Sequence, residues 1–158
     1  MNTMAISEKD LLNISQKLLD KARKDGIELN IVKLIVKKND TVLVLRRAST
    51  DSFPNLYELP GGGIDKNEDI FSAGRRELYE ETGLSIQKFF SEPQIVDVLT
   101  VSSHKKCRVY FLNILSEENE IILNKREHSE YKWVSINEVD NLFMFSEVRA
   151  LIKKNLEY

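Results

Sequence analysis

Residues 58–84 of this 158-residue chain read ELPGGGIDKNEDIFSAGRRELYEETGL and form the most informative segment of the sequence. Residues 68–82 have the pattern of an amphipathic helix. On that helix Glu77, Glu80 and Glu81 stand at i, i+3 and i+4, so their carboxylates share one face. Like charges at this spacing destabilise a helix by roughly a few tenths of a kcal/mol per pair. A cluster of hard oxygen anions on a rigid element is what Mg²⁺ or Mn²⁺ requires.

A proline and three glycines, Pro60–Gly63, precede the helix where a short strand runs into a loop. Glycines at such a junction let backbone atoms come close to a ligand or a metal. On the opposite helix face Phe71, Gly74 and Leu78 can pack on a sheet and aim the carboxylates outward. Separately, these features also fit a solvated acidic helix and a tight turn. Together they favour phosphoryl chemistry, in which a metal neutralises developing charge.

The same segment matches the Nudix box, G-x5-E-x7-R-E-U-x-E-E-x-G-U with U aliphatic, at every fixed position. The matching residues are Gly62, Glu68, Arg76, Glu77, Leu78, Glu80, Glu81, Gly83 and Leu84. The chain therefore resembles the Nudix hydrolases, and a looser similarity extends over about 30–155. The resemblance implies hydrolysis of a diphosphate bond in a nucleoside diphosphate linked to another moiety, with a divalent metal.

The rest of the pattern agrees with such a fold. Strands are predicted at 29–37, 42–46, 57–60, 94–102, 107–115 and 131–134, and helices at 8–25, 68–82 and within 136–156. Short antiparallel strand signals outnumber helices, so we expect the α+β class, as a Nudix-type α/β/α sandwich with a mixed β-sheet. We divide the chain into an N-terminal helical extension, 1–28, and a Nudix domain, 29–158.

The resemblance also implies roles for individual residues. The implied metal ligands are Glu77, Glu80, Glu81 and the backbone carbonyl of Gly61, with Mg²⁺ or Mn²⁺ as the cofactor. Arg76 and Glu68 match a pair that usually orients the loop and the helix.

The resemblance implies a general base from the box itself, where Glu77, Glu80 and Glu81 are the catalytic candidates, or from the loop before the late strand. Glu127 and Glu130 lie in the segment before Trp133, and Glu127 aligns better with the extra acid of MutT-type members. Either could instead be ordinary loop surface. The two histidines, His104 and His128, are expected to be turn or loop residues rather than ligands.

Substrate contacts are expected from the residues around the glycines. These candidates are Arg47, Phe53, Tyr57, Glu58, Gly61 and Gly62, with Phe143 as a further aromatic. Arg47 matches a phosphate-binding or nucleotide-binding position, although an exposed arginine at a sheet edge is an equal alternative. Ser52 and Ser146 stand where one subgroup has the histidine and asparagine that recognise oxidised guanine, which argues against that substrate. A non-catalytic nucleotide-sensing module is the alternative function.

The helix expected at 8–25 has a wide apolar face formed by Leu11, Leu12, Ile14, Leu18, Leu19 and Ala22. Ser7 can cap its start and Gly26 suits its end. An isolated helix of this length is marginal in water, so another surface must cover it. Its own domain or a second subunit of a symmetric homodimer could do so, and we favour the dimer.

Composition limits the partners. The 23 basic and 25 acidic residues nearly cancel, so there is no overall electrostatic signal for nucleic acid. No apolar run approaches the roughly 20 residues that span a bilayer. We expect a small-molecule nucleotide as partner, no membrane and no clear nucleic-acid binding. The only cysteine, Cys107, and the absence of a signal peptide fit the cytoplasm.

Overall fold

A mixed sheet of seven strands forms the centre of this computed structural model, which describes residues 4–100, 103–116 and 120–157. The strands are β1 (Leu29–Lys38), β2 (Thr41–Arg47), β3 (Tyr57–Glu58), β4 (Gly61–Gly63), β5 (Gln94–Leu99), β6 (Lys106–Leu115) and β7 (His128–Val134). The helices are α1 (Glu8–Lys24), α2 (Ile70–Thr82) and α3 (Ser146–Leu156), with a 3₁₀ turn η1 (Val139–Asn141). No helix in these ranges is long and apolar enough to cross a membrane.

The strand order is β3-β2-β1-β6-β5, with β4 also paired to β1 and β7 to β2. The β1–β6 pair is parallel, and the other pairs are antiparallel. β1 and β2 pair only next to their hairpin turn. Beyond it, β2 pairs with β3 and β7 while β1 pairs with the glycines of β4. This divergence brings the glycine strand and the start of β7 to the same open end of the sheet.

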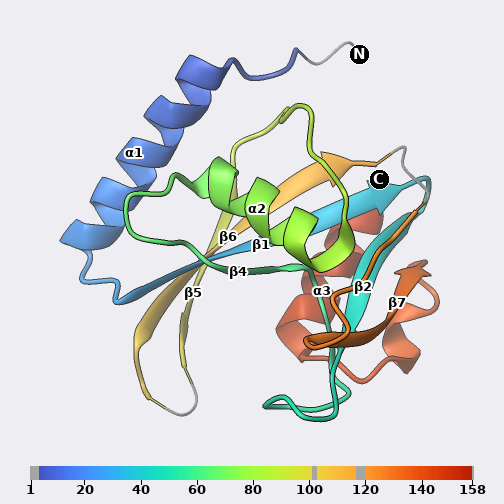
Figure 1. Cartoon of the computed structure of the whole chain (residues 1–158). Helices are drawn as coiled ribbons and strands as arrows, with labels where there is room; N and C mark the ends of the chain where they lie inside the picture. Colours follow the sequence, from blue (N-terminus) through green and yellow to red (C-terminus); the bar gives the residue numbers. More distant parts are fainter. Residues whose placement is uncertain (1–3, 101–102, 117–119, 158) are drawn as a thin grey trace.

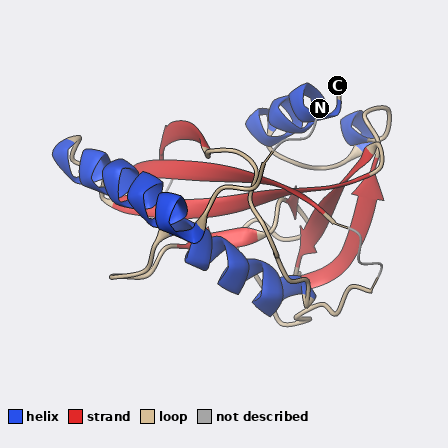
Figure 2. Cartoon of the chain, turned by 90° about the horizontal axis from the view of Figure 1, so that it is seen from above, coloured by secondary structure: helices blue, strands red, loops and turns tan. Residues whose placement is uncertain are grey.

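Helices cover both faces of the sheet (Figures 1 and 2). α1 and α2 pack on one face, over a core that includes Leu34, Leu45 and Leu112. α3 and η1 pack on the other, where Ile35, Val44 and Ile152 belong to a second core. Alternate residues of a strand point to opposite faces, which explains why the neighbours Leu34 and Ile35 enter different cores. The expected α/β/α sandwich is confirmed.

Capping residues at both ends of α2 fix its limits, and one glycine sets its distance from the sheet. The carboxylate of Asp69 accepts hydrogen bonds from the backbone N–H groups of Phe71 and Ser72, so the helix begins at Ile70 rather than at 68. Gly83 ends the helix in a left-handed conformation with φ 75°. A Cβ on Gly74 would lie 2.7 Å from the Leu112 side chain, so the glycine permits the close approach to the sheet that the sequence indicated.

Three predicted strand boundaries differ from the structure by two or three residues. The strand expected at 57–60 ends at Glu58, because Pro60 lacks the N–H that would continue a ladder, and the glycines form β4 instead. β7 begins at His128 rather than 131, because its pairing with β2 extends to Arg47. The strand expected at 94–102 ends at Leu99 as β5, and positions 101–102 lie outside the described residues.

The apolar face of α1 is covered by the helix's own domain. Leu11 belongs to the core beneath α2, and Ile14, Leu18 and Leu19 pack against that core. The buried hydroxyl of Ser15 accepts the backbone N–H of Ile70 at 2.8 Å, which ties α1 to the start of α2. Leu12, on the same face, stays exposed, and a second subunit as a further cover stays a prediction.

The consecutive residues Leu11 and Leu12 test this packing. Leu11 is 2% exposed and Leu12 is 56% exposed. Leu11→Ala is expected to lower the free energy of unfolding by about 2–5 kcal/mol, because it leaves a cavity in the core. Leu12→Ala should change it by less than about 0.5 kcal/mol. Urea denaturation of both variants makes the comparison, and equal effects would show that α1 does not pack as described.

Candidate functional site

Two glycines of β4 hold two carboxylates of α2. The N–H of Gly61 donates a hydrogen bond to Glu81 at 2.9 Å, and the Glu81 side chain is almost fully buried. At the next residue, a Cβ on Gly62 would lie 2.5 Å from the carboxylate oxygen of Glu77. Gly61 itself has φ 146°, and a Cβ there would meet the Val32 carbonyl at 2.1 Å. Only glycines therefore allow the strand and the carboxylates to approach this closely.

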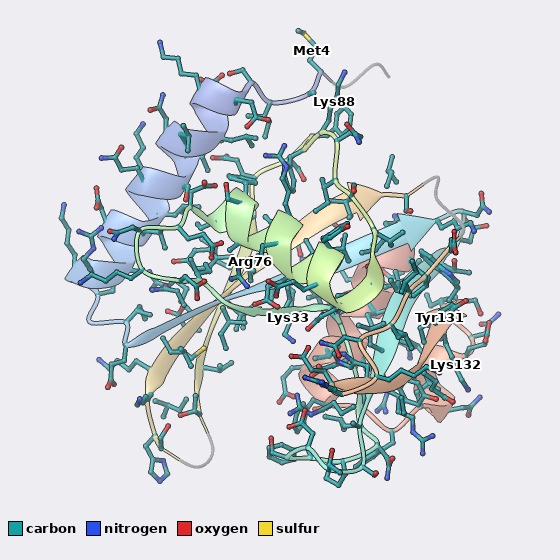
Figure 3. The ribbon with its side chains drawn as sticks, viewed as in Figure 1. Met4, Lys33, Arg76, Lys88, Tyr131 and Lys132 are labelled. Carbon is teal, nitrogen blue, oxygen red and sulfur yellow. The ribbon has the colours of Figure 1, made fainter. Side chains whose placement is uncertain are left out.

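Arg76 fixes the helix to the loop that precedes it, as the resemblance implied. Its guanidinium donates to both carboxylate oxygens of Glu68, at 2.8 and 2.9 Å, and to the Gly63 carbonyl at 3.0 Å. It also donates to Glu77 at 3.0 Å and to the more exposed Glu80 at 3.4 Å. Figure 3 shows Arg76 between α2 and β4. This clamp orients the helix face that carries the glutamates.

A third carboxylate comes from the segment before β7. Carboxylate oxygens of Glu81 and Glu127 and a ring nitrogen of His128 all lie within 4.8 Å of one another. Glu127 is exposed, and its charge also acts on Glu77. Burial raises the pKa of Glu77, Arg76 opposes the rise, and the charges of Glu80 and Glu127 add to it. The structure thus brings Glu127 to the glutamates of α2.

The electrostatics of the cluster suit a cation. Burial raises the pKa of Glu81 to about 8, although the charge of Lys33 and the Gly61 N–H favour the ionised form. The neighbouring Glu77 and Glu58 push the pKa further up. A bound divalent cation would remove this repulsion and supply the missing counter-charge. The donor set of closely spaced carboxylates fits such an ion.

Glu58 occupies the centre of an ionic network that adjoins the cluster through His128. Its carboxylate accepts from Arg47 and from His128, each at 2.8 Å, and lies 3.8 Å from the Lys33 ammonium. Burial opposes ionisation of Glu58, but Lys33, His128 and Arg47 outweigh it and lower the pKa to about 2. Arg47 also donates to the carbonyl and the hydroxyl of Ser52. The guanidinium thus holds the loop after β2, and its contact with substrate phosphate stays a prediction.

Glu130, the second candidate base, has different neighbours. Its carboxylate accepts a hydrogen bond from the Tyr57 hydroxyl and lies 3.9 Å from Arg46. Burial and the bond to Glu130 raise the pKa of Tyr57 to about 12. Tyr57 belongs to the core on the α3 side of the sheet. The structure therefore places Glu127, and not Glu130, within the cluster around Glu81.

The other two aromatic candidates lie at the surface. Phe53 is half exposed and packs edge to face on Phe145, with 5.4 Å between ring centroids. Its φ of 51° is a conformation that bulky residues rarely adopt. Phe143 is also exposed, and its carbonyl accepts the Tyr57 N–H at 2.8 Å. These rings form an exposed aromatic surface on the loop after β2 and the segment before α3.

Two polar residues near the cluster, Lys33 and His128, were missed or misplaced from the sequence alone. His128 begins β7 and is 2% exposed, so the expectation of a turn or loop residue is wrong. Lys33 of β1, whose ammonium lies 3.8 Å from Glu58, was not singled out. A lysine within the apolar run LNIVKLIVK was the available signal for Lys33. For His128 the available signal was its neighbour Glu127, a candidate general base.

Comparison with known proteins agrees with this geometry. The family model described as NUDIX domain matches residues 28–156. An RNA pyrophosphohydrolase from Bartonella clarridgeiae is 31% identical over 132 residues, covering 69% of this chain and 76% of the relative. The m7GpppN-mRNA hydrolase NUDT17 of Danio rerio is 34% identical over 82 residues, which cover 51% of this chain and only 26% of that protein.

A solved structure gives the same fold. The NUDIX domain of Shewanella oneidensis NrtR, complexed with ADP ribose, superposes with a TM-score of 0.69 at 20% identity, over 96% of this chain and 98% of that one. At this identity the likeness concerns the fold alone. The family model covers most of the chain, including both glycines and all the glutamates of the cluster. This chain belongs to the Nudix family of hydrolases.

Proposed function

We propose that this Nudix hydrolase cleaves a diphosphate bond in a nucleoside diphosphate linked to another moiety, and that it needs a divalent metal. One observation carries the proposal. The carboxylates of Glu77 and Glu81 are held against the backbone of Gly61 and Gly62, with Glu127 beside them. This arrangement concentrates negative charge at one point of a rigid frame, and a phosphate substrate can approach it only if a cation is bound there.

The proposed ion is Mg²⁺ or Mn²⁺, because carboxylate and carbonyl oxygens are the ligands that these hard ions prefer. The proposed ligands are Glu77, Glu80, Glu81 and the Gly61 carbonyl. When bound, the metal lowers the pKa of a bound water and neutralises charge on the phosphate. Arg76 keeps Glu77 and Glu80 on one side of the helix through its hydrogen bonds to both carboxylates.

The proposed general base is Glu127. Its carboxylate is exposed and lies beside Glu81, so it can accept a proton from an attacking water at the cluster. Glu130 is the second candidate, but its carboxylate already accepts the Tyr57 hydroxyl and faces Arg46. A carboxylate with these partners is a poorer proton acceptor at the cluster. We therefore place the base on the residue just before β7.

The proposed substrate is a small-molecule nucleotide. Phe53 and Phe143 offer exposed ring faces on which a base can stack. Arg47 and Glu58 hold the loop that carries Phe53, and Tyr57 follows it in β3. Test substrates are ADP-ribose, diadenosine polyphosphates, NADH, and canonical and oxidised NTPs. RNA with a 5′-triphosphate belongs in the same panel because the Bartonella relative is an RNA pyrophosphohydrolase.

Assembly, domain division and location complete the proposal. A homodimer stays a prediction, to be tested by sedimentation, although α1 does not need a partner subunit to cover its apolar face. We propose that residues 1–28 are an extension of the Nudix domain that folds with it, since Ser15 and Leu11 join its core. The unpaired, buried Cys107 supports a location in the reducing cytoplasm.

Gly62 and Gly63 give a matched test of the metal site. A Cβ on Gly62 would displace the Glu77 carboxylate, whereas a Cβ on Gly63 would meet nothing within 4 Å. Gly62→Ala is expected to weaken Mn²⁺ binding about tenfold or more while the fold persists, because only the end of a flexible side chain must move. Gly63→Ala should bind normally. Isothermal titration measures both, and equal affinities would remove Glu77 from the site.

Metal binding should depend on pH through Glu81. Its pKa in the folded, metal-free protein is raised from 4.5 to about 8, so the cation must displace a proton at neutral pH. Affinity is expected to rise about tenfold per pH unit up to about pH 8 and then level off. The raised pKa also means that the metal-free protein loses stability as the pH rises from 4.5 to about 8, because ionisation of the buried Glu81 carboxyl is unfavourable.

Calorimetry in buffers of different ionisation enthalpy measures the released proton. Glu81→Gln keeps an acceptor for the Gly61 N–H but has no proton to release, so the pH dependence should flatten in that variant. An affinity that does not change between about pH 6 and pH 8 would show that Glu81 is not a ligand.

Three glutamine variants test catalysis on the best substrate of the panel. Glu81→Gln should abolish most hydrolysis, and Glu127→Gln should lower kcat by about 10²–10⁴-fold, the usual contribution of a general base. Glu130→Gln should lower kcat by less than about tenfold. Glu92→Gln, at an exposed position outside the site, is the control. A larger loss in Glu130→Gln than in Glu127→Gln would exchange the two roles, and full activity in Glu81→Gln would refute the metal site.

A further inference from the structure

One ring nitrogen of His128 is buried without a partner. The Nε2 atom lies 2.8 Å from a carboxylate oxygen of Glu58. The Nδ1 atom is buried and has no hydrogen-bond partner; among the residues that the structure describes, the Asn113 Oδ1 atom is the other such side-chain atom. A buried polar atom of this kind costs free energy unless something binds it.

The hydrogen bond to Glu58 decides which nitrogen can accept a ligand. Glu58 also accepts from Arg47 at 2.8 Å and lies 3.8 Å from Lys33, so it is held ionised. An ionised carboxylate can only accept, and the Nε2 atom of His128 therefore carries the hydrogen and donates it. In the neutral ring the Nδ1 atom then has a free lone pair. A histidine that binds a metal is commonly oriented by a carboxylate in this way.

His128 belongs to the same cluster as the carboxylates. A ring nitrogen of His128 and carboxylate oxygens of Glu81 and Glu127 lie within 4.8 Å of one another. At this separation the His128 nitrogen and a Glu81 oxygen can converge on a single ion after small side-chain movements, with the Glu127 carboxylate beside it. The nitrogen and the oxygens come from different elements, α2 and the start of β7, so an ion here would also link them.

We propose that His128 is a ligand of the metal that Glu81 binds, through Nδ1, so that one metal position has mixed nitrogen and oxygen ligands beside the proposed base Glu127. The proposal rests on the metal site of the proposed function and adds its selectivity. Imidazole nitrogen suits first-row transition ions, whereas Mg²⁺ prefers an all-oxygen shell. This position therefore favours Mn²⁺ over Mg²⁺. The carboxylate of Glu58 orients the ring through its hydrogen bond with Nε2.

Pulsed electron paramagnetic resonance of bound Mn²⁺ tests the contact directly. Since the chain has two histidines, His104→Gln leaves His128 as the only imidazole. In that variant and in the full natural chain, the Mn²⁺ spectrum should show coupling to a directly bound nitrogen, and labelling histidine with ¹⁵N should change the coupling. Spectra are recorded at sub-stoichiometric and at excess metal. Absence of the coupling at both ratios overturns the proposal.

His128→Gln separates ligation from a structural role. A glutamine side-chain nitrogen can take the place of Nε2 and keep the bond to Glu58, but it offers no Nδ1. The nitrogen coupling should vanish, and Mn²⁺ affinity should fall about tenfold or more while Mg²⁺ affinity falls less. Equal losses for both ions, or no loss for Mn²⁺, would contradict nitrogen ligation. If the variant does not fold, the spectra of the natural chain and His104→Gln still decide.

These measurements need no turnover, so they separate two failures. A protein that shows the nitrogen coupling but hydrolyses no substrate of the panel would refute the proposed function and leave this ligand in place. Hydrolysis by a protein whose bound Mn²⁺ has no nitrogen ligand would refute only the role of His128.

Discussion

The burial of the Glu81 carboxylate beneath the N–H of Gly61 is the constraint on which the site depends. A carboxylate at this depth is poorly solvated, and its pKa of about 8 measures the cost of ionising it without a cation. The same contact fixes the distance between α2 and β4. Since a side chain at Gly61 or Gly62 would collide with backbone or with Glu77, the glycine strand and the glutamate helix must be considered as one unit.

The remainder of the fold holds that unit in place. Ser15 of α1 and Asp69 satisfy N–H groups at the start of α2, and Gly74 lets the helix lie close to the sheet. At the other end, the pairing of β2 with β7 brings Glu127 and His128 to the carboxylates. The helical extension thus contributes to the site indirectly, because it stabilises the helix that carries three of the glutamates.

The fold and most of the site could be predicted because the informative residues are adjacent in sequence. The spacing of Glu77, Glu80 and Glu81 on one helix, and the glycines before it, need only local geometry. The strand formed by Gly61–Gly63 was not foreseen, because pairing with β1 overrides the low strand propensity of glycine. The roles of Lys33 and His128 were not predicted for a similar reason. Their proximity to Glu58 and Glu81 depends on contacts between strands that are distant in sequence. The amphipathic pattern of α1 predicts an apolar face that must be buried, but it does not say which surface buries it.

We propose that Glu77 and Glu81 bind a divalent metal at the glycine strand, with the base Glu127 beside it. Anomalous diffraction from crystals grown with Mn²⁺ tests it most directly, because the ion is located independently of any assumption about the protein. We expect Mn²⁺ between α2 and β4, bound by Glu77 and Glu81, with Glu127 beside it. A peak bound only at other surface carboxylates, with Glu81 still protonated against the Gly61 N–H, would contradict it.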